Sequence, residues 1–261
     1  MYTAIYKIAD TFIKIHSLYQ DVHHLCRDYQ CRDNLYSDCY RSGEQPLFTI
    51  TTTPSDIEFE RKKSNLQDQK EGHEIRQFSD SYLETLAVYR KIAEVLLQED
   101  CLLFHGSAVA VDGSVYLFTA KSGTGKSTHT RLWRTLFGSR AVMVNDDKPL
   151  LKVMDKGVMV YGTPWDGKHR LSSNIAVPLK AICILERSQI NHIKLISRKE
   201  ALPVMIQQTY RPSDTEKLAK TMKLVDCLMS GAAIYRLGCN MELEAARIAY
   251  EGMQEERIGS K

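Results

Sequence analysis

The spacing of hydrophobic positions differs between the first hundred residues and the rest of the chain. Short apolar runs at 11–16 and 47–53 predict strands, and helical spacing predicts helices over about 18–29 and 81–98. Residues 61–80 are polar and charged throughout, so we expect a flexible loop there. These patterns predict a small α+β region over residues 1–98.

From residue 101 onward, strand-like and helix-like patterns alternate. Strands are predicted at 102–111, 114–119, 141–144, 181–185 and 233–237, and helices at 128–137, 199–208, 214–229 and 242–251. Asp112 with Gly113 indicates a two-residue hairpin turn, and residues 155–157 indicate another. This alternation predicts an α/β domain over residues 99–261, with a mixed sheet flanked by helices.

The composition fits a soluble globular protein, because 43% of the residues are hydrophobic and 26% are charged. No apolar run approaches the length of a membrane span, and the first residues lack the pattern of a secretion signal. The chain has 7 cysteines at irregular spacing and no CxxC pair. We therefore expect a cytoplasmic protein that does not interact with membranes.

The small net charge of +3 is the sum of two parts of the chain that carry opposite net charge. Residues 1–100 carry 12 basic and 17 acidic side chains, whereas residues 101–261 carry 23 basic and 15 acidic ones. The basic part shows no stripe of Lys and Arg interleaved with aromatic residues, so nucleic acid is not an expected partner. Its excess of positive charge instead suits a smaller polyanion.

A glycine-rich segment lies between the predicted strand at 114–119 and the predicted helix at 128–137. Residues 120–127 read AKSGTGKS, which fits the phosphate-loop pattern GxxxxGK followed by Ser or Thr, except that Ala120 replaces the first glycine. In such loops glycines let backbone N–H groups surround phosphate oxygens, the lysine reaches the β and γ phosphates, and the hydroxyl ligates Mg²⁺. The expected nucleotide-binding residues are Ser122, Gly123, Thr124, Gly125, Lys126, Ser127 and Thr128.

Two neighbouring acids, Asp146 and Asp147, follow the apolar run at 141–144. A helix of about ten residues and a short loop fit between Ser127 and these acids, which should therefore lie on a strand beside the phosphate loop. Adjacent strand residues point to opposite sides, so one carboxylate would face the metal and the other the substrate hydroxyl. A solvated turn over residues 145–148 is the alternative that this pattern leaves open.

The remaining candidate site residues are basic side chains and one histidine. Residues 161–170 read YGTPWDGKHR, in which Lys168 and Arg170 are cations that could stabilise charge on a transferring phosphoryl group. They could equally be surface charges. His105 lies in the predicted strand at 102–111, where a histidine is either a packed core residue or a site residue.

These residues together resemble the P-loop kinases typified by HPr kinase/phosphorylase and ATP-dependent phosphoenolpyruvate carboxykinase. The resemblance covers residues 100–187 and rests on His105 with Gly106, the hairpin at 112–113, SGTGKS at 122–127, and the acidic pair at 146–147. Those families place an antiparallel pair before the phosphate loop and adjacent acids after it. The chain is also similar to compact relatives found beside peptide-modification genes, some of which phosphorylate a serine of a precursor peptide.

The resemblance implies a role for each matching residue. Asp146 would be the base for the acceptor hydroxyl, Asp147 would hold metal with Ser127, and His105 would lie close by. With Lys126 and Arg170, these residues complete the expected catalytic and metal-binding set. Ala120 departs from the pattern, and the first 100 residues do not match the N-terminal domain of HPr kinase, so that enzyme's protein substrate is not implied.

We therefore expect a kinase that uses ATP and Mg²⁺ to transfer the γ-phosphoryl group to a hydroxyl of a peptide, a protein or a small molecule. One alternative is a regulator or scaffold that binds nucleotide without turnover. A carboxykinase-like reaction is disfavoured, since the chain has about half the length of that enzyme. HPr kinase assembles into hexamers, so the resemblance also allows a homo-oligomer.

Overall fold

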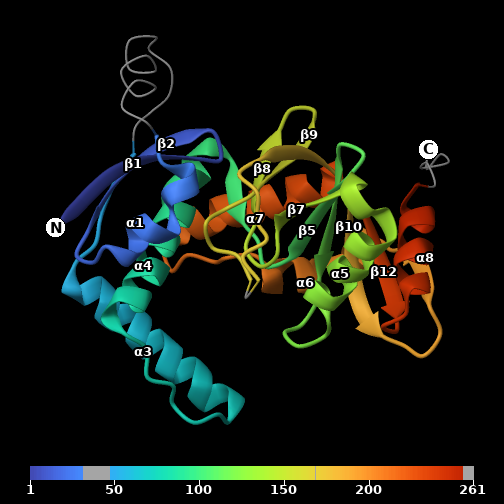
Figure 1. Ribbon diagram of the computed structural model, residues 1–261, viewed down its shortest axis with the longest axis horizontal. Coiled ribbons are helices and arrows are strands. Elements are labelled where there is room, and N and C mark those ends of the chain that lie inside the picture. The colour runs from blue at the N-terminus through green and yellow to red at the C-terminus, as the bar shows by residue number, and fades with distance from the viewer. Residues whose placement is uncertain (32–47, 168, 255–261) are drawn as a thin grey trace. The chain divides into compact units, whose positions relative to one another are not determined.

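The computed structural model describes residues 1–31, 48–167 and 169–254 (Figure 1). The chain divides into two compact units, Met1–Leu96 and Leu97–Lys261, which we describe separately. The expected boundary after residue 98 lies close to this division. Within the described residues, no helix has the length and apolar character that crossing a membrane requires.

The first unit contains a three-stranded sheet made of β1 (Tyr2–Ile8), β2 (Thr11–Ser17) and β3 (Phe48–Thr51). β1 pairs antiparallel with β2, and β2 pairs parallel with β3. The two strands predicted from apolar runs are therefore present as β2 and β3. β1 was not predicted.

Four helical segments of the first unit are described: α1 (Asp21–Leu25), η1 (Arg27–Tyr29), α3 (Pro54–Glu71) and α4 (Asp80–Leu96). The single helix expected over 18–29 is thus two shorter helical segments. α4 confirms the helix predicted from 81 onward. The flexible loop expected over 61–80 is wrong, because α3 extends to Glu71 and only the segment between α3 and α4 is irregular.

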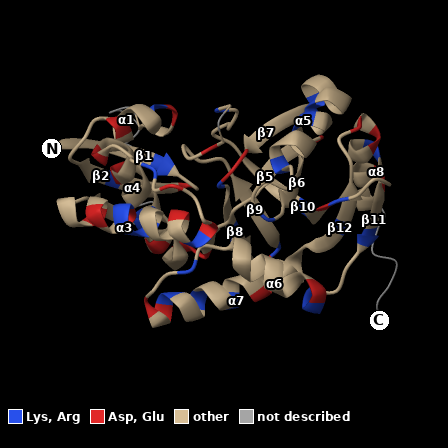
Figure 2. Cartoon of the chain, turned by 90° about the horizontal axis from the view of Figure 1, so that it is seen from below, with Lys and Arg blue, Asp and Glu red and all other residues tan. Residues whose placement is uncertain are grey.

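α3 forms despite its polar sequence because its ends are capped and its charges are paired. Thr53 and Asp56 make a capping box around Pro54, and Gly72 ends the helix at a left-handed φ of 70°. The buried carboxylate of Glu60 accepts a hydrogen bond of 2.6 Å from Arg90 of α4. Figure 2 shows the resulting mixture of basic and acidic segments along α3.

The second unit is built on one mixed sheet of nine described strands, flanked by helices, which confirms an α/β fold. Along the sheet the order is β4-β8-β9-β10-β6-β5-β7, and β12 pairs with both β10 and β11. The strands are β4 (Cys101–Leu103), β5 (Ser107–Val111), β6 (Ser114–Thr119), β7 (Ala141–Asn145), β8 (Leu150–Met154), β9 (Gly157–Tyr161), β10 (Ala176–Arg187), β11 (His192–Leu195) and β12 (Ala233–Cys239).

The directions of the central strands determine which loops share an edge of the sheet. β10 pairs parallel with β6 and with β12, whereas β5 pairs antiparallel with both β6 and β7. β6, β7, β10 and β12 therefore run in one direction, with β5 reversed between β6 and β7. The carboxyl ends of these four strands and the amino end of β5 consequently lie at one edge.

The strand expected over 102–111 is interrupted. β4 pairs with β8, β5 pairs with β6 and β7, and residues 104–106 cross between the two positions. The chain passes β6 so closely here that a Cβ on Gly106 would lie 3.0 Å from both Leu117 Cδ1 and Phe118 O. Sequence periodicity did not reveal this crossing, because the apolar residues on both sides of it, 101–104 and 108–111, together predict one strand.

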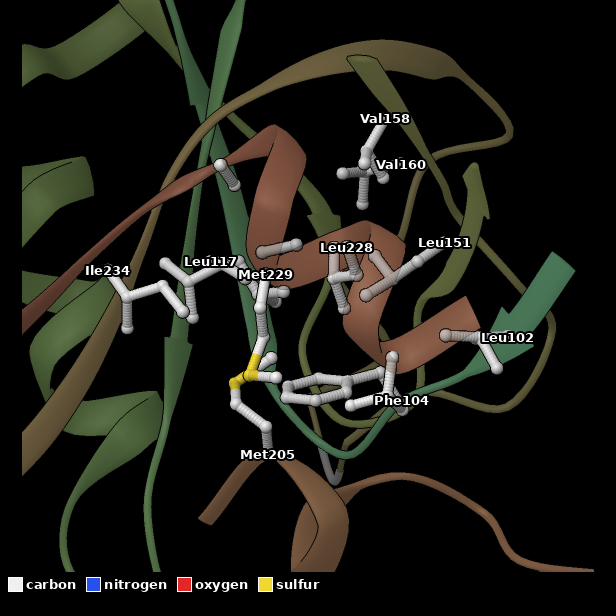
Figure 3. Packing of buried hydrophobic residues seen from close by; sticks show 14 of the residues in the cluster. Leu102, Phe104, Leu117, Leu151, Val158, Val160, Met205, Leu228, Met229 and Ile234 are labelled. Carbon is white, nitrogen blue, oxygen red and sulfur yellow. The ribbon is translucent and has the colours of Figure 1, made fainter. Parts of the chain in front are cut away.

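Helices cover both faces of the sheet in the second unit. α5 (Lys126–Phe137) and α8 (Leu243–Gln254) supply side chains to the core on one face, and α6 (Arg198–Gln208) and α7 (Thr215–Gly231) supply the other. β6 alternates accordingly, with Leu117 in one core and Phe118 in the other. Figure 3 shows the first of these cores, where Leu117 and Phe104 pack near Met205 and Met229.

Candidate functional site

The glycine-rich loop connects the carboxyl end of β6 to the amino end of α5. Gly123 has a φ of 75° and Gly125 a φ of 122°, which are left-handed values that side chains disfavour. Gly125 is also the N-cap of α5, and no side chain caps this helix. The first N–H groups of α5 are thus available to an anion, together with the positive end of the helix dipole.

Lys126 begins α5, and its Nζ donates a hydrogen bond of 3.2 Å to the carbonyl of Ala120, which is itself buried. Ala120, which stands where the phosphate-loop pattern has its first glycine, is therefore accommodated inside the core. Burial lowers the pKa of Lys126, while Asp147 and Asp146 act in the opposite direction, which places all three groups within electrostatic reach of one another. Ser127 is exposed at the start of the helix.

Asp146 and Asp147 follow β7, which ends at Asn145, so the expectation that both acids lie on a strand is wrong. Asp146 is 6% exposed, and its Oδ1 accepts a hydrogen bond of 2.6 Å from Ser107 Oγ at the amino end of β5. Ser107 Oγ also lies 3.1 Å from Thr130 Oγ1 of α5. A chain of buried polar contacts thus connects the acid to the helix that follows the glycine-rich loop.

The other oxygen of Asp146 faces the backbone of a second loop. A Cβ built on Gly167 would lie 2.9 Å from Asp146 Oδ2, tighter than real side chains tolerate. A residue with a side chain at position 167 would therefore require the Asp146 carboxylate or this loop to shift. The loop that carries the YGTPWDG sequence forms one wall beside Asp146.

Asp147 lies between two basic side chains. Its Oδ1 is 3.3 Å from His105 Nε2, and its Oδ2 is paired with Lys148 Nζ. Burial by itself would raise the pKa of Asp147, but the hydrogen bond from His105 and the contact with Lys148 outweigh it and lower this pKa to about 2. The structure thus brings His105 to the acidic pair, as the resemblance implied.

Asn145 fixes the positions of both loops around the acids. It is fully buried, and its Oδ1 accepts hydrogen bonds from the backbone N–H groups of Asp147, at 2.9 Å, and Lys148, at 2.5 Å. Its Nδ2 donates to Thr163 Oγ1 at 3.0 Å. The turn over 145–148 is therefore an organised part of the site rather than a solvated surface turn.

Arg170 lies in the same loop as Gly167, and its backbone N–H donates to Gly167 O at 3.1 Å. It has a φ of 47° and is exposed. Its contact with a phosphoryl group remains a prediction. Lys168 lies outside the described residues.

Ser107, Lys148 and Gly167 belong to this arrangement but were not predicted from the sequence. Ser107 directly follows the His105–Gly106 pair, and its polar side chain within an apolar strand was a usable signal. Gly167 and Lys148 carried no comparable signal, because their roles depend on how the two loops meet in space.

The comparisons with known proteins identify the family. A search of curated proteins finds no match. Among solved structures, the Hpr(Ser) kinase/phosphatase from Coxiella burnetii matches with 10% identity and a TM-score of 0.30, covering 59% of this chain and 99% of that chain. A family described as "SynChlorMet cassette protein ScmC" matches residues 73–224, which include the glycine-rich loop and both acids. Because this match spans more than half of the sequence, the chain belongs to the ScmC family.

Proposed function

We propose that the protein is a kinase that transfers the γ-phosphoryl group of ATP to a hydroxyl acceptor. The observation that carries this proposal is the shared sheet edge, where the glycine-rich loop after β6 and the acids after β7 flank the start of β5. Ser107 contacts both sides of this arrangement. A phosphate-binding loop beside a buried carboxylate is the pair of elements that phosphoryl transfer to a hydroxyl needs.

The loop residues fit the phosphates of a nucleotide. The N–H groups of the uncapped α5 would donate to phosphate oxygens, and Lys126 Nζ would leave the Ala120 carbonyl to contact the β and γ phosphates. An Arg170 side chain directed toward Gly167 would add a second cation at the γ-phosphoryl group. These contacts favour the transition state because charge develops on the equatorial oxygens during transfer.

The residues also fit Mg²⁺. Within the described ranges, no group of three or more His, Cys, Asp or Glu side chains could hold a metal ion. Mg²⁺ does not require such a cage, since it is bound by one or two protein oxygens together with phosphates and water. Ser127 and Asp147 would supply these oxygens, and Lys148 would then move away from Asp147. When bound, the ion neutralises charge on the β and γ phosphates.

Asp146 would act as the base. Its carboxylate would accept the hydroxyl proton as the acceptor oxygen bonds to the γ phosphorus, while the bond from that phosphorus to the bridging oxygen breaks and ADP leaves. Ser107 would hold Oδ1, so that Oδ2 is directed at the acceptor. His105 would keep Asp147 in place rather than take the proton itself.

Transfer of labelled phosphate from ATP to candidate hydroxyl acceptors tests this function. Because the family is described by its place in a cassette, the first acceptors to try are peptides and proteins encoded with it. Asp146→Asn should lower the rate about 10²- to 10⁴-fold. Asp226→Asn, at an exposed position of α7, is the matched control and should transfer like wild type.

Equal transfer by wild type and Asp146→Asn would exclude Asp146 as the base. Tight ATP binding by wild type without transfer to any acceptor would instead support a nucleotide-binding regulator.

A further inference from the structure

A cavity of about 650 Å³ adjoins the glycine-rich loop on the side away from the acids. Its walls include Gly123 and Thr128 from the loop and α5, and the turns that follow β10 and β12. In the sheet, β10 and β12 lie on one side of β6, whereas β5 and β7 lie on the other. A triphosphate with its γ end at the acids would therefore extend its other end toward this cavity.

The chemical character of the cavity differs from that of the acidic side. The lining residues in the described chain include no carboxylate, and their single formally charged side chain, Arg187, donates a hydrogen bond of 2.7 Å to Gly123 O. The remaining walls are amides, hydroxyls and apolar groups, including Gln189 and Met241. Such a lining suits an uncharged polar ring system better than additional phosphates.

The walls are fixed to each other by hydrogen bonds. The backbone N–H of Ser188 donates to Cys239 O at 3.0 Å, and that of Asn240 donates to Asn191 Oδ1 at 2.9 Å. Asn240 Nδ2 also donates to Gln189 O at 3.3 Å. The turns after β10 and β12 thus form one connected wall, so the cavity is largely formed before any ligand binds.

A buried donor at the cavity lacks a partner. His129 lines the cavity, is 2% exposed, and accepts a hydrogen bond of 3.0 Å from Trp133 Nε1 on its Nε2. Burial lowers the pKa of His129 to about 4, so the neutral ring carries its proton on Nδ1. Among the described residues, Nδ1 has no hydrogen-bond partner. A buried N–H without an acceptor is costly, so His129 is a polar residue of the cavity wall that the protein itself leaves unsatisfied.

We propose that this cavity binds the nucleoside half of the nucleotide, with the base between Met241 and the turn at Gln189. This inference rests on the proposed function, since it places the nucleoside of the nucleotide whose phosphates the loop holds. Met241 is 78% exposed and Gln189 is exposed, so both side chains are available to a ligand without repacking the core.

We would compare the binding of ATP with that of inorganic tripolyphosphate, both with Mg²⁺. The comparison distinguishes contacts to the nucleoside from contacts to the phosphates. Tripolyphosphate fills only the phosphate loop, whereas ATP also fills the cavity. In the double variant Gln189→Ala, Met241→Ala, calorimetry should give an ATP Kd raised about tenfold, with a tripolyphosphate Kd changed less than about twofold. Met154→Ala removes a 51% exposed methionine from the end of β8, away from the cavity, and should leave both constants unchanged.

Three results would overturn the inference. If wild type binds tripolyphosphate as tightly as ATP, or if the double variant keeps the wild-type ATP affinity, the cavity does not hold the nucleoside, although the proposed function stands. If wild type binds neither probe, both the proposed function and this inference fail. Circular dichroism of the double variant confirms that any loss of ATP binding is not a loss of fold.

Discussion

A buried carboxylate in each unit, Glu84 in the first and Asp146 in the second, accepts hydrogen bonds, but the two carboxylates have different surroundings. In the first unit, Glu84 is fully buried and accepts hydrogen bonds from Leu18 N at 2.6 Å, from Tyr19 N at 2.8 Å and from Thr52 Oγ1. In the second unit, Asp146 accepts one hydrogen bond from a described side chain, that of Ser107, and its Oδ2 faces Gly167.

The difference concerns how many donors each carboxylate receives. Both oxygens of Glu84 are used to hold the segment between β2 and α1 and the residue after β3 to α4, so this group stabilises the unit and has little capacity left for a ligand. Asp146 is held at one oxygen and approached by a glycine at the other. A carboxylate in that arrangement can exchange a proton with a substrate.

Glu84→Gln should give the largest effect, because an NH₂ group would replace an oxygen that faces donors. We expect the free energy of unfolding to fall by about 3 kcal/mol, measured by urea denaturation. Glu74→Gln, at an exposed position in the same unit, should leave it unchanged. An unaltered stability in Glu84→Gln would mean that the donors are satisfied in another way.

Gly167→Ala tests the side of Asp146 on which Oδ2 faces the loop that carries Gly167. The added Cβ would press on Asp146 Oδ2 and displace it, and misplacing a reacting group by about 1 Å can cost roughly 100-fold in rate, or about 2.7 kcal/mol. Steady-state phosphoryl transfer measures this effect. Gly231→Ala is the control, since its Cβ would make an ordinary contact of 3.7 Å with Val158. Full activity in Gly167→Ala would show that the loop does not approach Asp146 during catalysis.

Asp147 extends the comparison to a carboxylate that is held by two basic side chains, those of His105 and Lys148. Its pKa of about 2 lies below the ordinary 3.8, so its contribution to stability is present above pH 4 and is lost as the pH falls toward 2. The difference in unfolding free energy between wild type and Asp147→Asn should therefore be about 2 kcal/mol at pH 6 and should shrink below pH 4. A difference that is constant from pH 6 to pH 3 would contradict this account.

Ser107→Ala gives the smallest expected change, because it removes only the hydrogen bond that orients Asp146. We expect kcat to fall about tenfold, with the KM for ATP unchanged. Thr221→Val, which removes another fully buried hydroxyl in α7, provides the control for general destabilisation. A rise in KM without a fall in kcat would assign Ser107 to nucleotide binding instead.

The sequence predicted much of the second unit because its elements follow simple rules. Apolar strands alternate with amphipathic helices, and the turn at Asp112 and Gly113 has the positive φ values, 51° and 76°, of the expected hairpin. The glycine-rich loop connects a strand to a helix, as its motif requires. These features depend on neighbours along the chain, so periodicity and turn chemistry are sufficient to find them.

Features that depend on distant contacts could not be predicted in the same way. α3 has no apolar stripe, and its charged residues are stabilised by partners such as Arg90 and Arg76 that its own pattern does not reveal. The crossing at Gly106 and the approach of Gly167 to Asp146 are set by close passage of two backbones. The cavity beside the glycine-rich loop likewise joins turns that lie far apart in the sequence.

The reversed strand β5 has a consequence for redesigning the protein. Neighbouring strands lie about 4.8 Å apart, so inserting β5 between β6 and β7 separates the loop from the acids by about two strand spacings. The short crossing at residues 104–106 enters this gap with His105, whose carbonyl accepts a hydrogen bond of 3.0 Å from Thr119 Oγ1 at the end of β6. Under the proposed function, changes in this crossing would therefore alter both the room for an acceptor and the strand that carries the glycine-rich loop.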